Sequence, residues 1–157
     1  MKTAQKVGIE KIISGGQTGA DRAALDFAIE QGIPHGGWLP KGRLAEDGTL
    51  DSKYRLRETH STDHSARTGK NVIDSDGTLI LFYNELSGGS LLTLDLARKH
   101  DRPVLAIDLA GENLTFESVR QWIAENKVKV LNVAGPRAST CPKIYEGALD
   151  FLRHLFT

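Results

Sequence analysis

The sequence is poor in cysteine, carries no excess of one charge and lacks long apolar runs. Cys141 is the only cysteine in 157 residues, which excludes an internal disulfide and any zinc or iron–sulfur site built from several cysteines. Lys and Arg number 20, and Asp and Glu also number 20, so the formal net charge is zero. No general field therefore attracts nucleic acid or an anionic membrane, and we expect neither as a partner.

No apolar run approaches the roughly 20 residues that cross a bilayer, and the first residues lack the apolar stretch of a secretory signal. We therefore expect a cytoplasmic protein. The five histidines show none of the close spacings typical of metal sites, so no metal ligand is predicted. A hydrophobic content of 39% and a charged content of 25% fit one globular domain over residues 1–157.

Short apolar runs alternate with segments of helical period. The runs predict strands over residues 11–13, 78–83, 103–107 and 128–133, and the period predicts helices over 20–31 and 90–100, from Thr115, and through the last residues. This alternation predicts the α/β class, a single Rossmann-like doubly wound domain whose mostly parallel sheet has helices on both faces. The many leucines of residues 90–100 predict that this helix is among the most buried. Residues 32–76 predict a long loop with a helix over 64–73, and such loops usually bind something.

The strongest local signal lies between the first strand and the first helix. It reads Ser14-Gly15-Gly16-Gln17-Thr18-Gly19-Ala20-Asp21-Arg22. Such a turn presents free N–H groups and the positive end of a helix dipole, for which phosphate is the natural occupant. The spacing is neither that of a Walker A motif nor GxGxxG. The alternative interpretation is a tight turn that needs glycine only for packing.

Two later turns should meet the first at the same edge of the sheet. They are Ser87-Gly88-Gly89-Ser90 and the segment 134–139, which carries Arg137 and Ser139. Lys41 and Arg43 beside Gly42 could fold over the same anion. The predicted binding residues are Gly15, Gly16, Gln17, Thr18, Gly19, Asp21, Arg22, Lys41, Gly42, Arg43, Gly88, Gly89, Ser90 and Arg137.

Three further features have mainly structural interpretations. Asp74-Ser75-Asp76-Gly77-Thr78 matches the nucleophile motif of haloacid-dehalogenase-like phosphatases, but the strand here follows the motif instead of preceding it. A turn or N–H-capping role for Asp74 and Asp76 is favoured. Trp38 is the aromatic side chain placed to stack on a flat heterocycle, and Cys141 is interpreted as a small residue at a helix start.

Three segments carry a resemblance to a known family: SGGQTGADRAALDFAIE from Ser14, GIPHGGWLPKGRLAEDG from Gly32, and RTxxNVxDSDGTLIL from Arg67. In order and spacing they resemble the molybdenum carrier family. This resemblance implies a Rossmann-like domain related to the nucleotide-binding superfamily that includes the LOG phosphoribohydrolases. It also implies binding of the molybdenum cofactor, a phosphorylated pterin dithiolene, with a molybdoenzyme as the recipient.

The resemblance also assigns roles to the glycine turns. The first turn and Gly88-Gly89-Ser90 would each cradle an anion. The phosphoribohydrolases carry PGGxGTxxE at the second turn, where this chain has Leu91, Leu92 and Asp95 in place of glycine, threonine and glutamate. We therefore favour a small-anion carrier and assign no catalytic residue. The alternatives are a nucleotide hydrolase that uses Asp95 or Asp21, and a nucleotide sensor. We expect a homo-oligomer.

Overall fold

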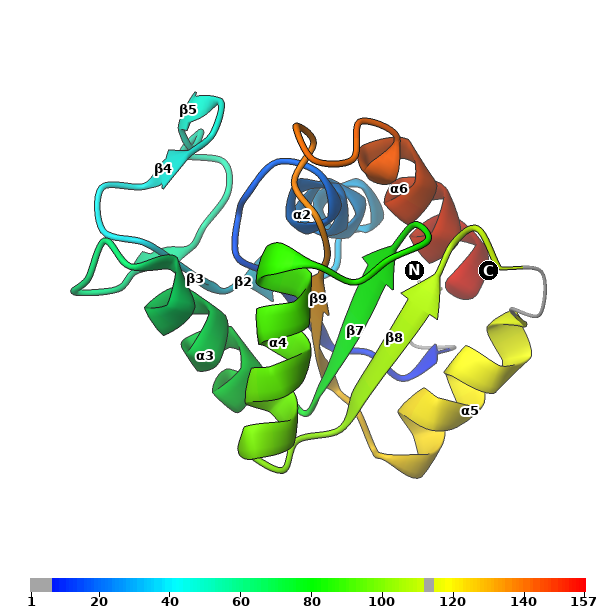
Figure 1. Cartoon of the computed structure of the whole chain (residues 1–157). Coiled ribbons are helices and arrows are strands. Elements are labelled where there is room, and N and C mark those ends of the chain that lie inside the picture. Colours follow the sequence, from blue (N-terminus) through cyan, green and yellow to red (C-terminus); the bar gives the residue numbers. More distant parts are fainter. Residues whose placement is uncertain (1–6, 112–114) are drawn as a thin grey trace.

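The computed structural model describes residues 7–111 and 115–157. At its centre lies a sheet whose strands are all parallel (Figure 1). The strands are β1 (Lys11–Ile13), β2 (His35–Gly36), β7 (Gly77–Phe82), β8 (Val104–Asp108) and β9 (Val130–Ala134). Their order across the sheet is β2-β1-β9-β7-β8. β7 and β9 are apolar along most of their length because helices cover both of their faces.

The strand order is that of a Rossmann domain with a shifted starting point. If β9 is counted as the first strand, the order across the sheet becomes 3-2-1-4-5, which is the arrangement of dinucleotide-binding domains. The order then reverses between β9 and β7. In open parallel sheets, ligands bind outside the carboxyl ends of the strands at such a reversal.

Five helices of the described residues lie on the two faces of this sheet (Figure 1). α2 (Ala20–Gln31), α5 (Phe116–Glu125) and α6 (Ile144–Leu155) share one face, and α3 (His64–Asp74) and α4 (Gly88–Lys99) cover the other. α2 and α6 pack closely, with the rings of Phe27 and Phe156 4.9 Å apart. The predicted doubly wound α/β fold is confirmed.

Local signals set the helix ends. α2 ends at Gly32, whose φ of 69° places it in the left-handed region that favours glycine. Asp63 and Thr115 cap α3 and α5 by accepting hydrogen bonds from the N–H groups of Ser65 and Ser118. No helix in the part of the chain described here is long and apolar enough to span a membrane.

The prediction that the leucine-rich helix is among the most buried was wrong. In α4 the buried residues are Ser90, Thr93 and Ala97, whereas Leu91 is 43% exposed. Small side chains at this helical spacing let the helix axis approach the sheet and α3 closely. The leucines are therefore displaced to the flank of the helix.

The long segment between β2 and α3 packs as a small layer beside α2. It contains the parallel pair β3 (Trp38–Leu39) and β6 (Arg57–Glu58), and the hairpin of β4 (Leu44–Ala45) and β5 (Gly48–Thr49). Its core consists of Leu25, Leu39, Leu50, Tyr54 and Leu56. The Asp26 carboxylate accepts hydrogen bonds of 2.5 Å from the hydroxyls of Tyr54 and Tyr145, which ties this layer to α2 and α6.

Candidate functional site

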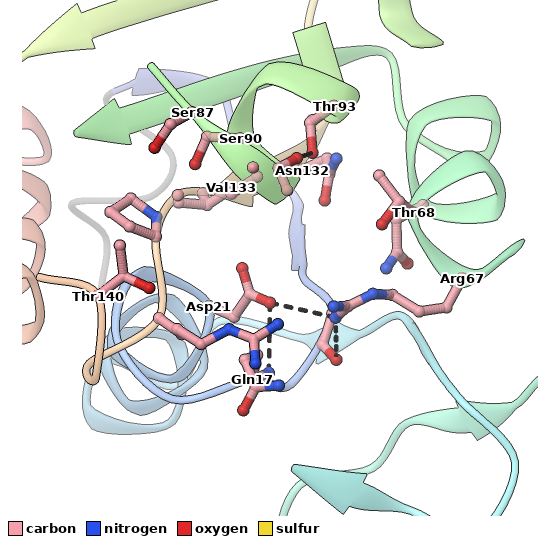
Figure 2. A pocket seen from close by; sticks show the side chains of 18 residues that line it. Gln17, Asp21, Arg67, Thr68, Ser87, Ser90, Thr93, Asn132, Val133 and Thr140 are labelled. Carbon is pink, nitrogen blue, oxygen red and sulfur yellow. Dashed lines mark hydrogen bonds and ion pairs between the residues drawn. The ribbon is translucent and has the colours of Figure 1, made fainter. Parts of the chain in front are cut away.

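A pocket of about 290 Å³ opens at the carboxyl ends of β9 and β7, where the strand order reverses (Figure 2). Its walls come from the first glycine turn, α3, the start of α4 and the turn after β9. The lining residues are Gly15, Gln17, Asp21, Arg67, Thr68, Asn71, Ser87, Gly88, Gly89, Ser90, Thr93, Asn132, Val133, Ala134, Gly135, Pro136, Arg137 and Thr140. The three turns predicted from the sequence thus meet at one site.

The start of α4 forms the open part of this pocket. A Cβ atom added to Gly88 or Gly89 would have no other atom within 4 Å, so these residues leave room for a ligand to approach the backbone. The N–H groups of Gly88 and Gly89 precede the first bonds of the helix, which Ser90 and Leu91 donate to the Ser87 carbonyl oxygen, and the dipole favours negative charge there. The predicted roles of Gly88 and Gly89 are therefore compatible with the space around them.

Ser90 contributes a buried hydroxyl to the same wall. The side chain is 2% exposed and its Oγ has no hydrogen-bond partner, whereas the nearby Thr93 hydroxyl donates to the Gly89 carbonyl oxygen at 2.8 Å. Burying a hydroxyl without a partner costs about 1–3 kcal/mol. This cost favours a ligand with hydrogen-bonding oxygens at this place.

The first glycine turn is closely packed instead. A Cβ on Gly15 would lie 1.8 Å from Arg67 Nη1, and one on Gly19 would lie 2.4 Å from the Pro136 carbonyl oxygen. Gly16 has a φ of 78° and faces the leucines of the small layer. The packing interpretation thus accounts for these glycines, and the turn reaches the pocket through Gly15, Gln17 and Asp21.

The turn of the β4–β5 hairpin forms hydrogen bonds with the polar side chains of Thr18 and Arg22. The Glu46 carboxylate accepts hydrogen bonds from the hydroxyls of Thr18 and Ser139 and from the Ser139 N–H at 3.1 Å. These bonds hold the pKa of Glu46 below its usual value. Arg22 donates to both oxygens of Asp47, at 2.9 and 3.1 Å. Thr18 and Arg22 therefore hold the hairpin and do not line the pocket.

The structure does not bring Lys41, Gly42 and Arg43 to the pocket either. The Arg43 guanidinium donates to carbonyl oxygens of Leu50, Tyr54 and two neighbouring loop residues. It therefore organises the loop instead of closing over an anion. Gly42 N–H donates to Glu58 Oε1 at 2.8 Å.

An ion pair forms the opposite wall of the pocket. Arg67 Nη1 lies 3.3 Å from Asp21 Oδ2 and 2.7 Å from the Gly15 carbonyl oxygen. Figure 2 shows the end of the Arg67 side chain directed toward Asp21. Burial raises the pKa of Asp21, and the positive charge of Arg67 opposes this rise. Arg67 lies outside the predicted binding set, although the sequence offers it as a charged candidate on the predicted helix 64–73.

The turn after β9 supplies a second cation. Gly135 is required by packing, because a Cβ there would lie 2.3 Å from the Leu81 carbonyl oxygen. This close approach lets the chain turn over the sheet edge, and Arg137 follows it in the pocket wall. With β9 counted as the first strand, this turn corresponds to the phosphate-binding first turn of a Rossmann domain. The polar side chains of Asn132 and Thr140 also lie in the wall; Asn132 begins a segment that resembles the family, NVAGPRxS, but neither residue was in the predicted binding set.

The remaining candidates lie elsewhere. Trp38 Nε1 donates to Asp74 at 2.7 Å, and Trp38 does not line the pocket, so the structure does not support its stacking on a ligand there. Asp76 accepts hydrogen bonds from the N–H groups of Lys129 and Val130, which confirms its capping role. Within residues 7–111 and 115–157, no three His, Cys, Asp or Glu side chains gather as metal ligands would.

A parallel sheet of this order, with a polar pocket at the reversal, defines a Rossmann-type α/β domain. The model of the circularly permutated YpsA SLOG family matches residues 12–156. The chain belongs to this family, and the permutation agrees with the Rossmann order obtained when β9 is counted first.

Solved structures extend this comparison. The crystal structure of "Putative molybdenum carrier protein" from Syntrophus aciditrophicus SB is 50% identical, covers 96% of both chains and gives a TM-score of 0.91. The structure of (E)-4-hydroxy-3-methyl-but-2-enyl diphosphate reductase is 10% identical, with a TM-score of 0.40 over 98% of this chain and 66% of the other, and it adds nothing to the argument. No curated protein matches the sequence.

Proposed function

We propose that the protein binds the molybdenum cofactor, or a similar phosphorylated heterocycle, and carries it to a molybdoenzyme. The observation that carries this proposal is the start of α4, where Gly88 and Gly89 leave open space beside a buried, unpartnered Ser90 hydroxyl. The molybdenum assignment rests on the resemblance to the 50% identical relative.

The charge of the pocket suits a phosphate. The pocket is lined by two arginines, Arg67 and Arg137, and by one carboxylate, that of Asp21. Asp21 pairs with Arg67, so the lining keeps a net positive charge. The phosphate of the cofactor would accept hydrogen bonds from the α4 N–H groups and the Ser90 hydroxyl. In this arrangement the protein shields and positions its ligand, and the cofactor itself supplies the redox chemistry after delivery.

Anaerobic purification from a host that accumulates molybdenum cofactor tests the proposal. Oxidation of the released material should give the fluorescent pterin product, with molybdenum, near one equivalent per chain. Gly89→Asp should abolish this binding, because its carboxylate repels the phosphate while remaining favourable in a first helical turn. Gly69→Asp is the matched control, since Gly69 also has open space beside it but lies outside the pocket lining. A folded protein that carries neither pterin nor molybdenum would overturn the carrier assignment.

A second candidate function is hydrolysis of the glycosidic bond of a nucleotide, and Asp21 is the observation that favours it. Asp21 lines the pocket, and burial raises the pKa of its carboxyl, which is the direction that suits a group donating a proton to a leaving base. Asp95, the other acid considered, is exposed on α4 and does not line the pocket. Release of free base from nucleoside monophosphates, lost in Asp21→Asn, would establish this function.

A further inference from the structure

Two oxygen atoms in the pocket lining accept no hydrogen bond from the described residues. Asp21 Oδ2 accepts from the Gln17 N–H at 3.2 Å and from Arg67 at 3.3 Å, which leaves Oδ1 free. In Asn132 the amide nitrogen donates to Thr78 Oγ1 at 3.2 Å, which leaves the amide oxygen free. In Figure 2 both free oxygens are directed into the space enclosed by the labelled side chains.

The burial of these two side chains makes the free oxygens significant. Asp21 and Asn132 are both more than nine-tenths buried, and both line the pocket. Protein covers the rest of each side chain, so the pocket is the place where the free oxygens can meet a donor. Buried acceptors without a partner are costly and are normally satisfied in native proteins. A ligand in this pocket is therefore expected to bring hydrogen-bond donors to them.

The same walls also contain free donors. Gln17 Oε1 accepts from the N–H groups of Thr18 at 3.0 Å and Glu46 at 2.8 Å, so the amide nitrogen is the end left without a partner among the described residues. Arg67 uses both Nη atoms in hydrogen bonds, whereas its Nε is buried and unpartnered within the same part of the chain. Gln17 and Arg67 both line the pocket. Free donors and free acceptors are thus mixed in one small site.

Hydroxyl groups suit this mixture best. A hydroxyl donates one hydrogen bond and accepts others through its lone pairs, so it can bond a free oxygen and a free N–H together. A ring carbonyl only accepts, and an amino group bonded as N–H only donates. An ammonium group is disfavoured because Arg67 and Arg137 already bring positive charge to the lining.

We infer that the pocket binds a phosphorylated sugar or polyol, with its phosphate at the start of α4 and its hydroxyl groups on the free oxygens of Asp21 and Asn132. The volume of about 290 Å³ lies at the lower limit of ligand pockets and suits a compound of this size. The inference rests on the phosphate site proposed at α4. It adds a requirement for hydroxyl groups near the phosphate, which the family assignment of the fold does not specify.

Calorimetric titration of the whole protein with ribose 5-phosphate and pentyl phosphate tests the inference. The two probes share a phosphate and five carbons, but pentyl phosphate has no hydroxyl group. Ribose 5-phosphate should bind about tenfold more tightly, the effect expected from one or two net hydrogen bonds.

Two variants examine the free oxygens separately. Asn132→Ala deletes one free acceptor and leaves the ion pair of Asp21 with Arg67 in place. Asp21→Asn keeps the shape of the side chain, but the donors on Oδ2 require an acceptor there, so the amide nitrogen takes the place of the free Oδ1. Each variant should weaken ribose 5-phosphate binding severalfold and narrow the preference over pentyl phosphate. Asn126→Ala is the matched control, since it removes an exposed carboxamide outside the pocket lining.

The outcomes separate this inference from the proposed function. Equal affinity for the two probes would overturn the recognition of hydroxyl groups while leaving the phosphate site intact. A preference that persists unchanged in both Asn132→Ala and Asp21→Asn would overturn it as well. Failure of ribose 5-phosphate, pentyl phosphate and inorganic phosphate alike would remove the phosphate site and with it this inference. The carrier function is tested independently by the pterin and molybdenum content of the protein.

Discussion

Arg67 and Asp21 dominate the electrostatics of the pocket at the scale of single residues. Their side chains are 11% and 9% exposed, so removal of one partner strands a buried charge. Arg67→Met should therefore destabilise the protein by about 3 kcal/mol at neutral pH. Burial already raises the pKa of Asp21 above the usual aspartate value of 3.8, and loss of Arg67 should raise it further.

The pH dependence of this variant has a definite sign. Because the folded pKa of Asp21 exceeds the unfolded one, the folded state binds the extra proton, and stability is lost as pH rises through the folded value. In urea unfolding, the free energy of unfolding of Arg67→Met should lie below that of the unsubstituted protein, and this difference should shrink as pH falls. The double variant Arg67→Met, Asp21→Asn should show no such trend. A deficit independent of pH would contradict the role given to Asp21.

The glycine turns show what can be predicted about single residues. The sequence indicates where glycine is needed but not why, because open space and close contact both require a missing Cβ. Gly89 and Gly15 look equivalent in the sequence, yet one faces open space and the other lies under Arg67. The difference depends on α3, which is distant in the sequence.

At the scale of elements, the hairpin of β4 and β5 is held by the Glu46 carboxylate. Hydrogen bonds from Ser139 and Thr18 lower the pKa of this group, so its contribution is present above the unfolded pKa and lost as pH falls through the folded one. The Ser139 amide resonance should report a transition whose midpoint lies below the usual glutamate pKa of 4.5. Glu46→Gln should remove the transition. A Ser139 amide insensitive to Glu46 titration would show that the hairpin is not held in this way.

Element boundaries were predictable to within a few residues, but the faces of α4 were not. α2 spans Ala20–Gln31 as predicted, because Gly32 ends it locally. In α4 the buried stripe consists of Ser90, Thr93 and Ala97, and the leucines beside it obscure that stripe in the sequence. Which side of an apolar helix packs depends on how closely its neighbours approach.

At the scale of the whole molecule, alternation of strands and helices was enough to predict the fold class. The position of β9 between β1 and β7 was not predictable, since no local signal specifies which strands become neighbours across a sheet. That position creates the reversal of strand order and brings Arg137 to the pocket. The turn after β9 therefore contributes more to the pocket than its sequence alone indicates.

The exposed flank of α4 supports the expectation of a homo-oligomer. Leu91 is 43% exposed, and Leu92, Leu94 and Leu96 are half-buried beside the edge strand β8. A helix that exposes leucine beside an edge strand offers a surface to a second copy of the chain. Sedimentation should give a mass that is a multiple of 17.2 kDa, and Leu91→Glu should shift it toward the single chain. Ile29→Glu, on α2 and 42% exposed, is the control and should leave the mass unchanged. A wild-type protein that sediments as a single chain, or dissociation by Ile29→Glu alone, would exclude α4 as the interface.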